Sequence, residues 1–162
     1  MEILSSINSI AHIISSSLAL IIGAMVLFQT KGTPKHKRLG VYYFWLMIVA
    51  NVTCLFIMKA FGKWFFPHYL GLAALAVLIP GYLFGKYQWS KHWLKVHIVS
   101  IVLSYYLLIG GAINEAFLHI PPLRPYIIGG GGPVLGMTHM VAQIAFIVLI
   151  VVYLRKYRKW RT

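Results

Sequence analysis

Five separate stretches of roughly 20 residues carry almost no charge, and they limit most strongly what this chain can fold into. A helix of that length rises about 30 Å, which is the thickness of the hydrocarbon layer of a bilayer. Of the 162 residues, 60% are hydrophobic and only two are acidic, so a soluble domain would lack a polar surface. We therefore predict an all-α integral membrane bundle, a single domain with five transmembrane helices. The expected spans are residues 7–28, 41–58, 67–84, 93–115 and 134–154.

Basic residues between these segments predict the orientation of the bundle. Twelve of the 15 fall on one side: Lys31, Lys35, Lys37, Arg38, Lys86, Lys91, Lys95, Arg155, Lys156, Arg158, Lys159 and Arg161. The other side holds Lys59, Lys63 and Arg124. Because cytoplasmic loops carry the excess of Lys and Arg, we expect the N-terminus outside and the C-terminus inside the cell membrane. The net charge of +13 lies in short runs, which favours anionic lipid headgroups over nucleic acid as the partner.

Two connections carry the strongest helix-breaking signals. Residues 31–38 combine Gly32 and Pro34 with four basic side chains, and we read them as a turn and a charge cluster. The longest connection contains Pro121, Pro122, Pro125 and the glycine run 129–132, so regular helix is not expected there.

Polar and small residues recur every three or four positions on three of the expected helices. These stripes are Asn8, His12, Ser16, Ala19 and Gly23 in the first helix, His97, Ser100, Ser104, Gly111 and Glu115 in the fourth, and Gly136, His139 and Gln143 in the fifth. Polar side chains in a membrane turn toward the protein interior, and small residues let helices approach closely. The stripes are therefore expected to face inward, and they would equally suit contacts with a membrane-protein partner or a second copy of the chain.

Histidines are the strongest candidates for chemistry, because imidazole is the commonest metal ligand in proteins. In the expected topology, His12, His68 and His139 lie at similar depth in the outer leaflet, with Glu115 near the same level. Three imidazoles could hold zinc with an open fourth position, and two could ligate the iron of haem b. Ordinary hydrogen bonds between helices are the alternative reading of the same residues.

A second group of histidines lies near the cytoplasmic side. His36 and His92 fall in the basic connections, and His97 lies about one turn inside the fourth span. We include His36 and His97 with the outer histidines as candidate cofactor-binding residues. Glu115, one of only two acidic residues, could also carry protons or pair with Arg124.

The most specific motif of the chain is the run Lys-Gly-Thr-Pro-Lys-His-Lys-Arg-Leu-Gly at residues 31–40. Tyr42, Asn51-Val52-Thr53, Pro67-His68 with Leu70 to Leu72, His97, Ser104-Tyr105 and Glu115 extend the pattern over most of residues 12–115. With these residues the chain resembles the bacterial membrane-protein family known as domain of unknown function 2306. The resemblance implies a polytopic protein of a bacterial cytoplasmic membrane, in which positions matching His12, His36, His68 and His97 recur. It implies no particular activity.

The sequence therefore favours a multi-pass membrane protein with a histidine-lined metal or haem site in the outer leaflet, which would support redox or metal-assisted chemistry. The alternative is a non-catalytic subunit or assembly factor of a larger membrane complex. A third reading, a solute carrier with a proton path through Glu115 and His97, is less favoured because the five spans show no repeat pair.

Overall fold

The computed structural model describes residues 2–57, 66–128 and 133–158, and within these ranges all the regular structure is helical. The helices are α1 (Glu2–Phe28), α2 (Pro34–Leu55), α3 (Phe66–Tyr87), α4 (Trp93–His119), α5 (Pro125–Ile128) and α6 (Pro133–Lys156). All except α5 are long and apolar enough to cross a membrane. The prediction of an all-α chain with five long apolar helices is confirmed.

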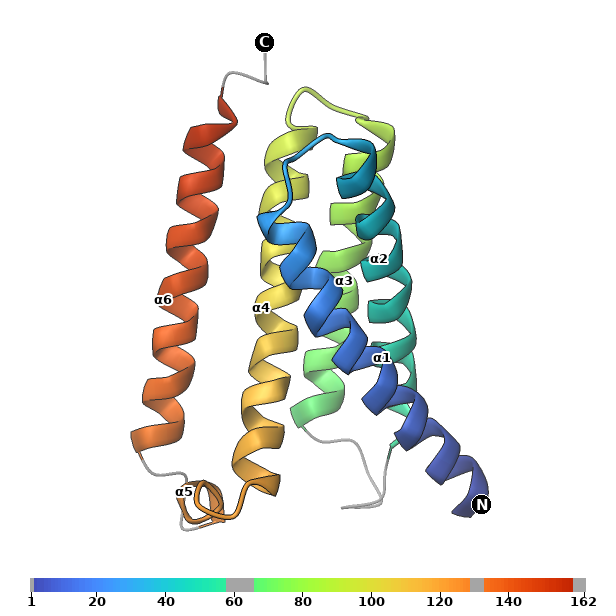
Figure 1. Cartoon of the computed structure of the whole chain (residues 1–162), viewed down its shortest axis with the longest axis vertical. Coiled ribbons are helices and arrows are strands. Elements are labelled where there is room, and N and C mark those ends of the chain that lie inside the picture. The colour runs from blue at the N-terminus through green and yellow to red at the C-terminus, as the bar shows by residue number, and fades with distance from the viewer. Residues whose placement is uncertain (1, 58–65, 129–132, 159–162) are drawn as a thin grey trace.

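Helices α1 to α4 form a closed ring of four, to which α6 is added from outside (Figure 1). Each helix packs on the next along the chain, and α1 returns to pack on α4. Helices α2 and α4 therefore occupy opposite corners of the ring. The start of α1 and the end of α6 lie at opposite ends of the molecule (Figure 1).

Helix α2 begins seven residues before the predicted span, within the basic run. Thr33 is its N-cap, and the Thr33 side chain accepts a hydrogen bond from the backbone N–H of His36. Pro34 occupies the first turn, where its missing N–H costs nothing. The expected turn over residues 31–38 is wrong from Pro34 onward, because local capping outweighs the charges of Lys35, Lys37 and Arg38. His36 therefore belongs to helix α2 and not to a loop, and it lies on the side of this helix that faces the interior of the bundle.

The proline-rich connection after α4 also contains more structure than expected. A single helical turn, α5, begins at Pro125, where proline is compatible with the first position of a helix. Several sequence-based assignments lie outside the described residues: Lys59, Lys63, the glycine run 129–132, Lys159 and Arg161.

Small residues on α1 make room for side chains of the other helices in the ring. Ala19 on α1 is fully buried, and a Cβ atom added at Gly23 would lie only 2.5 Å from the ring of Tyr105 on α4. The Tyr105 hydroxyl donates a hydrogen bond to the Leu20 carbonyl at 2.8 Å, which fastens α4 to α1.

The polar stripes are confirmed only in part. Ser104 is fully buried on α4, but Ser15 rather than Ser16 is the buried serine of α1. Gln143 is exposed, and none of the described residues of α6 is buried. Helix α6 packs mainly on α4, and it meets α1 near its C-terminal end, where the Tyr153 hydroxyl donates to the Leu27 carbonyl.

Candidate functional site

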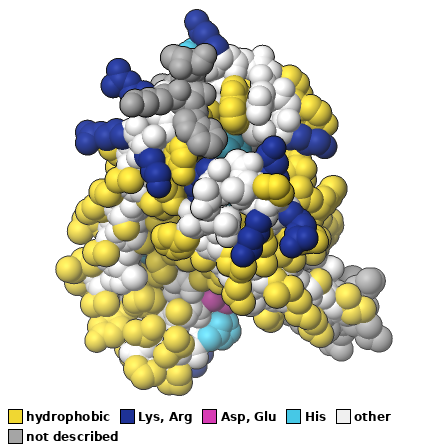
Figure 2. Space-filling model, turned by 45° about the horizontal axis from the view of Figure 1, so that its top comes forward, with side chains coloured by type: hydrophobic (Ala, Val, Ile, Leu, Met, Phe, Trp, Pro, Cys, Tyr) yellow, Lys and Arg dark blue, Asp and Glu magenta, His cyan; other side chains and the backbone are white. Residues whose placement is uncertain are grey.

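A cavity of about 560 Å³ opens at the end of the bundle that carries the basic turns. Its walls come from the end of α1, the turn after it, the starts of α2 and α4, and the ends of α3 and α6. Figure 2 shows Lys and Arg side chains gathered at this end, above an apolar surface. The basic and aromatic side chains that line the cavity are Lys31, His36, Lys37, Tyr43, Tyr82, Lys86, Trp93, His97, Tyr153 and Tyr157.

His97 on α4 is held against the backbone of α3. Its Nδ1 lies 2.8 Å from the carbonyl oxygen of Gly81. A carbonyl oxygen can only accept a hydrogen bond, so Nδ1 carries the hydrogen and the neutral ring keeps its lone pair on Nε2. Gly85 makes room for the ring, because a Cβ atom there would lie 2.7 Å from Cε1 of His97 and closer still to Nδ1.

His36 enters the same cavity from α2, at the opposite corner of the ring. It lies close enough to His97 and Lys31 for electrostatic interaction with both. Its ring also interacts with the backbone carbonyl of Val26, and its buried Nδ1 has no other hydrogen-bond partner among the described residues. A buried polar atom without a partner is uncommon in a native structure, and it often marks a place where a ligand, ion or water completes the site.

Lys31 joins the end of α1 to α6 at the rim of the cavity. Its ammonium donates hydrogen bonds to the carbonyls of Val26 and Leu27, where the negative end of the helix dipole favours a cation. It also lies 4.7 Å from the ring centroid of Tyr153, whose hydroxyl donates to the Leu27 carbonyl. Burial, with a smaller contribution from the nearby Lys156, lowers the pKa of Lys31 from 10.5 to about 8.

Aromatic side chains form the inner part of the cavity. Tyr43 is 1% exposed, and its hydroxyl lies 3.0 Å from Oγ of Ser104. Ser104 donates its own hydrogen to the Ile101 carbonyl, so Tyr43 is the donor of this pair. Tyr82 of α3 stacks on Phe44 of α2 with ring centroids 4.0 Å apart, and this contact holds Tyr82 in place. The cavity therefore changes from cationic at its mouth to aromatic and apolar inside.

The outer histidines are placed differently from the sequence-based expectation. Nδ1 of His12 lies 2.8 Å from the Ala50 carbonyl, and Nε2 of His139 lies 3.0 Å from Oδ1 of Asn114. His68 is buried on α3, with 1% of its surface exposed. Glu115 pairs with His119 one turn later at 3.1 Å, and both side chains are largely exposed.

These outer residues do not come together as one metal centre. Among the residues that the structure describes, no group of three His, Cys, Asp or Glu side chains could hold a metal ion. The hydrogen bonds of His12 and His139 join neighbouring helices, as in the alternative reading of these residues. Zinc or haem at the outer histidines stays a prediction without structural support. The structure instead brings together His36 and His97.

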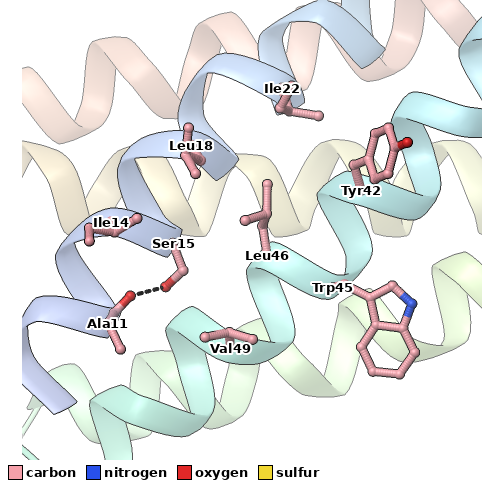
Figure 3. Close-up of a pocket in the computed structure, with 9 residues that line it drawn as sticks. All are labelled: Ala11, Ile14, Ser15, Leu18, Ile22, Tyr42, Trp45, Leu46 and Val49. Carbon is pink, nitrogen blue, oxygen red and sulfur yellow. Dashed lines mark hydrogen bonds between the residues drawn. The ribbon is translucent and has the colours of Figure 1, made fainter. Parts of the chain in front are cut away.

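A second pocket, of about 580 Å³, lies between α1 and α2 and is almost entirely apolar. Figure 3 shows its nine lining residues: Ala11, Ile14, Ser15, Leu18, Ile22, Tyr42, Trp45, Leu46 and Val49. The Ser15 hydroxyl is turned onto its own helix, where it donates to the Ala11 carbonyl at 2.6 Å (Figure 3). Apart from Ser15 and the hydroxyl of Tyr42, the lining residues offer only aliphatic and aromatic surface.

Sequence reasoning identified His36 and His97 but missed Lys31, Tyr43 and Gly85. One available signal was the pair Gly81 and Gly85, since small residues four apart on a membrane helix mark a close helix contact. The roles of Lys31 and Tyr43 had no such signal, because they depend on which helices meet at this end.

Comparisons with models of known protein families, with curated proteins and with solved structures found no match. The resemblance to the family known as domain of unknown function 2306 therefore stays a prediction.

Proposed function

We propose that this chain is a multi-pass protein of the cytoplasmic membrane whose basic cavity faces the cytoplasm and binds an anionic amphiphile. Such a ligand has a negatively charged head and an apolar body. The observation that carries the proposal is the charge around the cavity: Lys31, Lys37 and Lys86 line it, and no acidic side chain is among its lining residues. The only acidic residues of the chain, Glu2 and Glu115, belong to the opposite end of the bundle.

The proposed orientation of the bundle in the membrane rests on the basic residues at the end that carries the cavity. The described residues place ten basic side chains there: Lys31, Lys35, Lys37, Arg38, Lys86, Lys91, Lys95, Arg155, Lys156 and Arg158. Arg124 is the basic residue described in the connection at the other end. The positive-inside rule assigns the basic end to the cytoplasm and the start of α1 to the outside.

Electrostatics favours an anion at the mouth of the cavity. Cations close to a low-dielectric interior repel one another unless a negative charge neutralises them, and burial makes both effects stronger. The lowered pKa of Lys31 reflects this cost, since the described residues at this end provide no carboxylate side chain to pair with the ammonium. A bound anion would supply that partner.

The shape of the cavity favours an amphiphile over a simple ion. Below the lysines, the lining residues are Tyr43, Ile98 and Val102, which offer aromatic and aliphatic surface. A volume of about 560 Å³ is typical of a small-molecule or cofactor site rather than of an ion site. The head would meet the lysines, and the apolar body would displace water from the deeper walls.

Native mass spectrometry of the full chain in detergent would test the proposal. The probes are phosphatidylglycerol, phosphatidylcholine and inorganic phosphate. We expect phosphatidylglycerol to bind more tightly than phosphatidylcholine, with inorganic phosphate failing to compete at equal concentration. Lys37→Gln should weaken phosphatidylglycerol binding about fivefold, from about 1 kcal/mol per basic residue near an anionic surface.

Lys35→Gln is the matched control, because Lys35 is also exposed on the same turn of α2 but does not line the cavity. Equal losses in the two variants would mean that surface charge alone attracts the lipid. That result, or equal binding of the two phospholipids, would contradict the proposed site.

A further inference from the structure

We propose that the head of the amphiphile carries a hydroxyl group, which donates a hydrogen bond to Nε2 of His97. This inference rests on the proposed function and names the ligand class of that same cavity: an anionic phospholipid with a hydroxyl-bearing head, such as phosphatidylglycerol. In this proposal the lysines set the preference for negative charge, and His97 sets the choice among anionic lipids.

The geometry of His97 decides which kind of hydrogen bond it can offer to a ligand. Its Nδ1–H is held by the Gly81 carbonyl at 2.8 Å, so the neutral ring has its lone pair on Nε2. A Cβ atom at Gly85 would lie 2.7 Å from Cε1 of His97, and this close fit keeps the ring against α3. Nε2 is consequently a hydrogen-bond acceptor, and a ligand group that meets it has to be a donor.

Nε2 is also the nitrogen of this ring that a ligand can reach. It has no hydrogen-bond partner among the described residues, and it is not one of their buried polar atoms, so it has accessible surface where His97 lines the cavity. When a ligand displaces water from such an acceptor without replacing the hydrogen bond, binding is weakened. Sites with a positioned acceptor select in this way for a ligand that carries a hydroxyl group.

His36, the other histidine of the cavity, is engaged with the protein itself. Its ring interacts with the Val26 carbonyl, which also accepts a hydrogen bond from the Lys31 ammonium at 2.8 Å. Its Nδ1 is buried, so a ligand in the cavity does not reach this atom. We therefore assign His36 to the wall of the cavity and the contact with the ligand to His97.

A hydroxyl-bearing anionic head matches the neighbours of His97. The charge of Lys31 acts on the rings of both His36 and His97, so a cation and the acceptor lie within electrostatic range of each other. The phosphodiester of phosphatidylglycerol is negatively charged, and the glycerol that follows it carries hydroxyl groups. The phosphate can therefore meet a lysine while a hydroxyl group donates to Nε2. Ile98 and Val102 offer aliphatic surface to the apolar part of the lipid.

The test compares phosphatidylglycerol with phosphatidylpropanol, a lipid of the same charge and head length that has no hydroxyl group on its head. Native mass spectrometry of the full chain in detergent measures the affinity of each lipid, with identical acyl chains. We expect phosphatidylglycerol to bind about fivefold more tightly, which is the effect of one hydrogen bond. Free glycerol phosphate should not compete at equal concentration, because it has no apolar body. Competition by this soluble head group would overturn the assignment of a lipid.

Two substitutions remove the acceptor in different ways. His97→Asn can keep the hydrogen bond to the Gly81 carbonyl through its amide N–H, but it has no atom at the position of Nε2. His97→Phe keeps an aromatic ring and loses both nitrogens. Each variant should lower the affinity for phosphatidylglycerol to that for phosphatidylpropanol and leave the affinity for phosphatidylpropanol unchanged. His92→Phe is the control, because His92 is exposed and does not line the cavity, and it should keep the preference.

The unmodified chain and either variant can each contradict the inference. Equal binding of the two lipids to the unmodified chain would overturn it, and so would a preference for phosphatidylglycerol that persists in His97→Asn or His97→Phe. If His97→Phe does not fold, His97→Asn decides, since it can retain the bond between α4 and α3.

The hydroxyl inference and the proposed function fail in different ways. If the two lipids bind equally while their binding depends on Lys37 and not on Lys35, the hydroxyl inference is overturned and the anionic site stands. If the binding of neither lipid depends on Lys37, both are overturned.

Discussion

Replacing Gly85 by alanine should disturb the site more than any other single methyl group. The added Cβ would lie 2.7 Å from Cε1 of His97 and closer still to Nδ1, distances that atoms in proteins do not adopt. The ring would have to move, and its hydrogen bond to Gly81 would be lost, at a cost of about 1 kcal/mol. Overpacking adds about 1–3 kcal/mol, whereas the better helix propensity of alanine returns up to about 1 kcal/mol. The net loss of unfolding free energy should therefore be about 1–3 kcal/mol.

Reversible unfolding in mixed detergent micelles, with Gly111→Ala as the control, would measure this loss. Nothing lies within 4 Å of a Cβ atom added at Gly111, so that substitution in α4 should be neutral or stabilising. A double variant separates the cause: once His97→Ala has removed the ring, Gly85→Ala should lose most of its effect. Additive effects of the two substitutions, or equal stability of Gly85→Ala and Gly111→Ala, would refute the reasoning.

Three further predictions concern other parts of the site and the bundle. Tyr43→Phe removes the hydrogen bond to Ser104 and should lower the unfolding free energy by about 1 kcal/mol in the same assay, whereas Tyr42→Phe at the exposed neighbour should not. Because the pKa of Lys31 is about 8 in the folded chain and 10.5 for an unperturbed lysine, its contribution to stability should rise from pH 8 to 10.5. Phosphatidylglycerol binding should instead weaken as pH rises through 8, and Lys31→Arg should remove that dependence; identical pH profiles would contradict this. A phosphatase reporter that needs the periplasm should be inactive after Thr162 and active after Arg124, and the reverse pattern would reject the orientation.

Most helix bounds could be predicted because their signals are local. The apolar length of each segment and the prolines, glycines and charges between segments act within a few residues of the boundary. The start of α2 was missed for a related reason: the charges of Lys35, Lys37 and Arg38 suggested a loop, although Thr33 and Pro34 together form a good helix start. Charged side chains on the first turns of a helix remain solvated outside the hydrocarbon, so they need not end it.

The candidate site was predicted less well than the helices. Depth along a helix follows from counting residues, and this placed His12, His68 and His139 at one level. The direction in which each side chain points around its helix depends on the neighbouring helices. In the structure, His12 hydrogen-bonds to Ala50 and His139 to Asn114, and the two do not face a common centre. His36 and His97 had been grouped only by their depth near the cytoplasmic side, and in the structure they line one cavity.

The sequence alone determined that this chain forms long apolar helices and that its positive charge lies at one end. Both properties follow from composition and residue spacing, because each depends on one segment alone and not on how the segments pack. Only the tertiary structure decided which side chains meet, because that depends on helix order, rotation and close approach at residues such as Gly23 and Gly85. The cavity lined by Lys31, His36 and His97 exists because α1, α2, α3, α4 and α6 converge at one end, a relation between distant segments that no local pattern records.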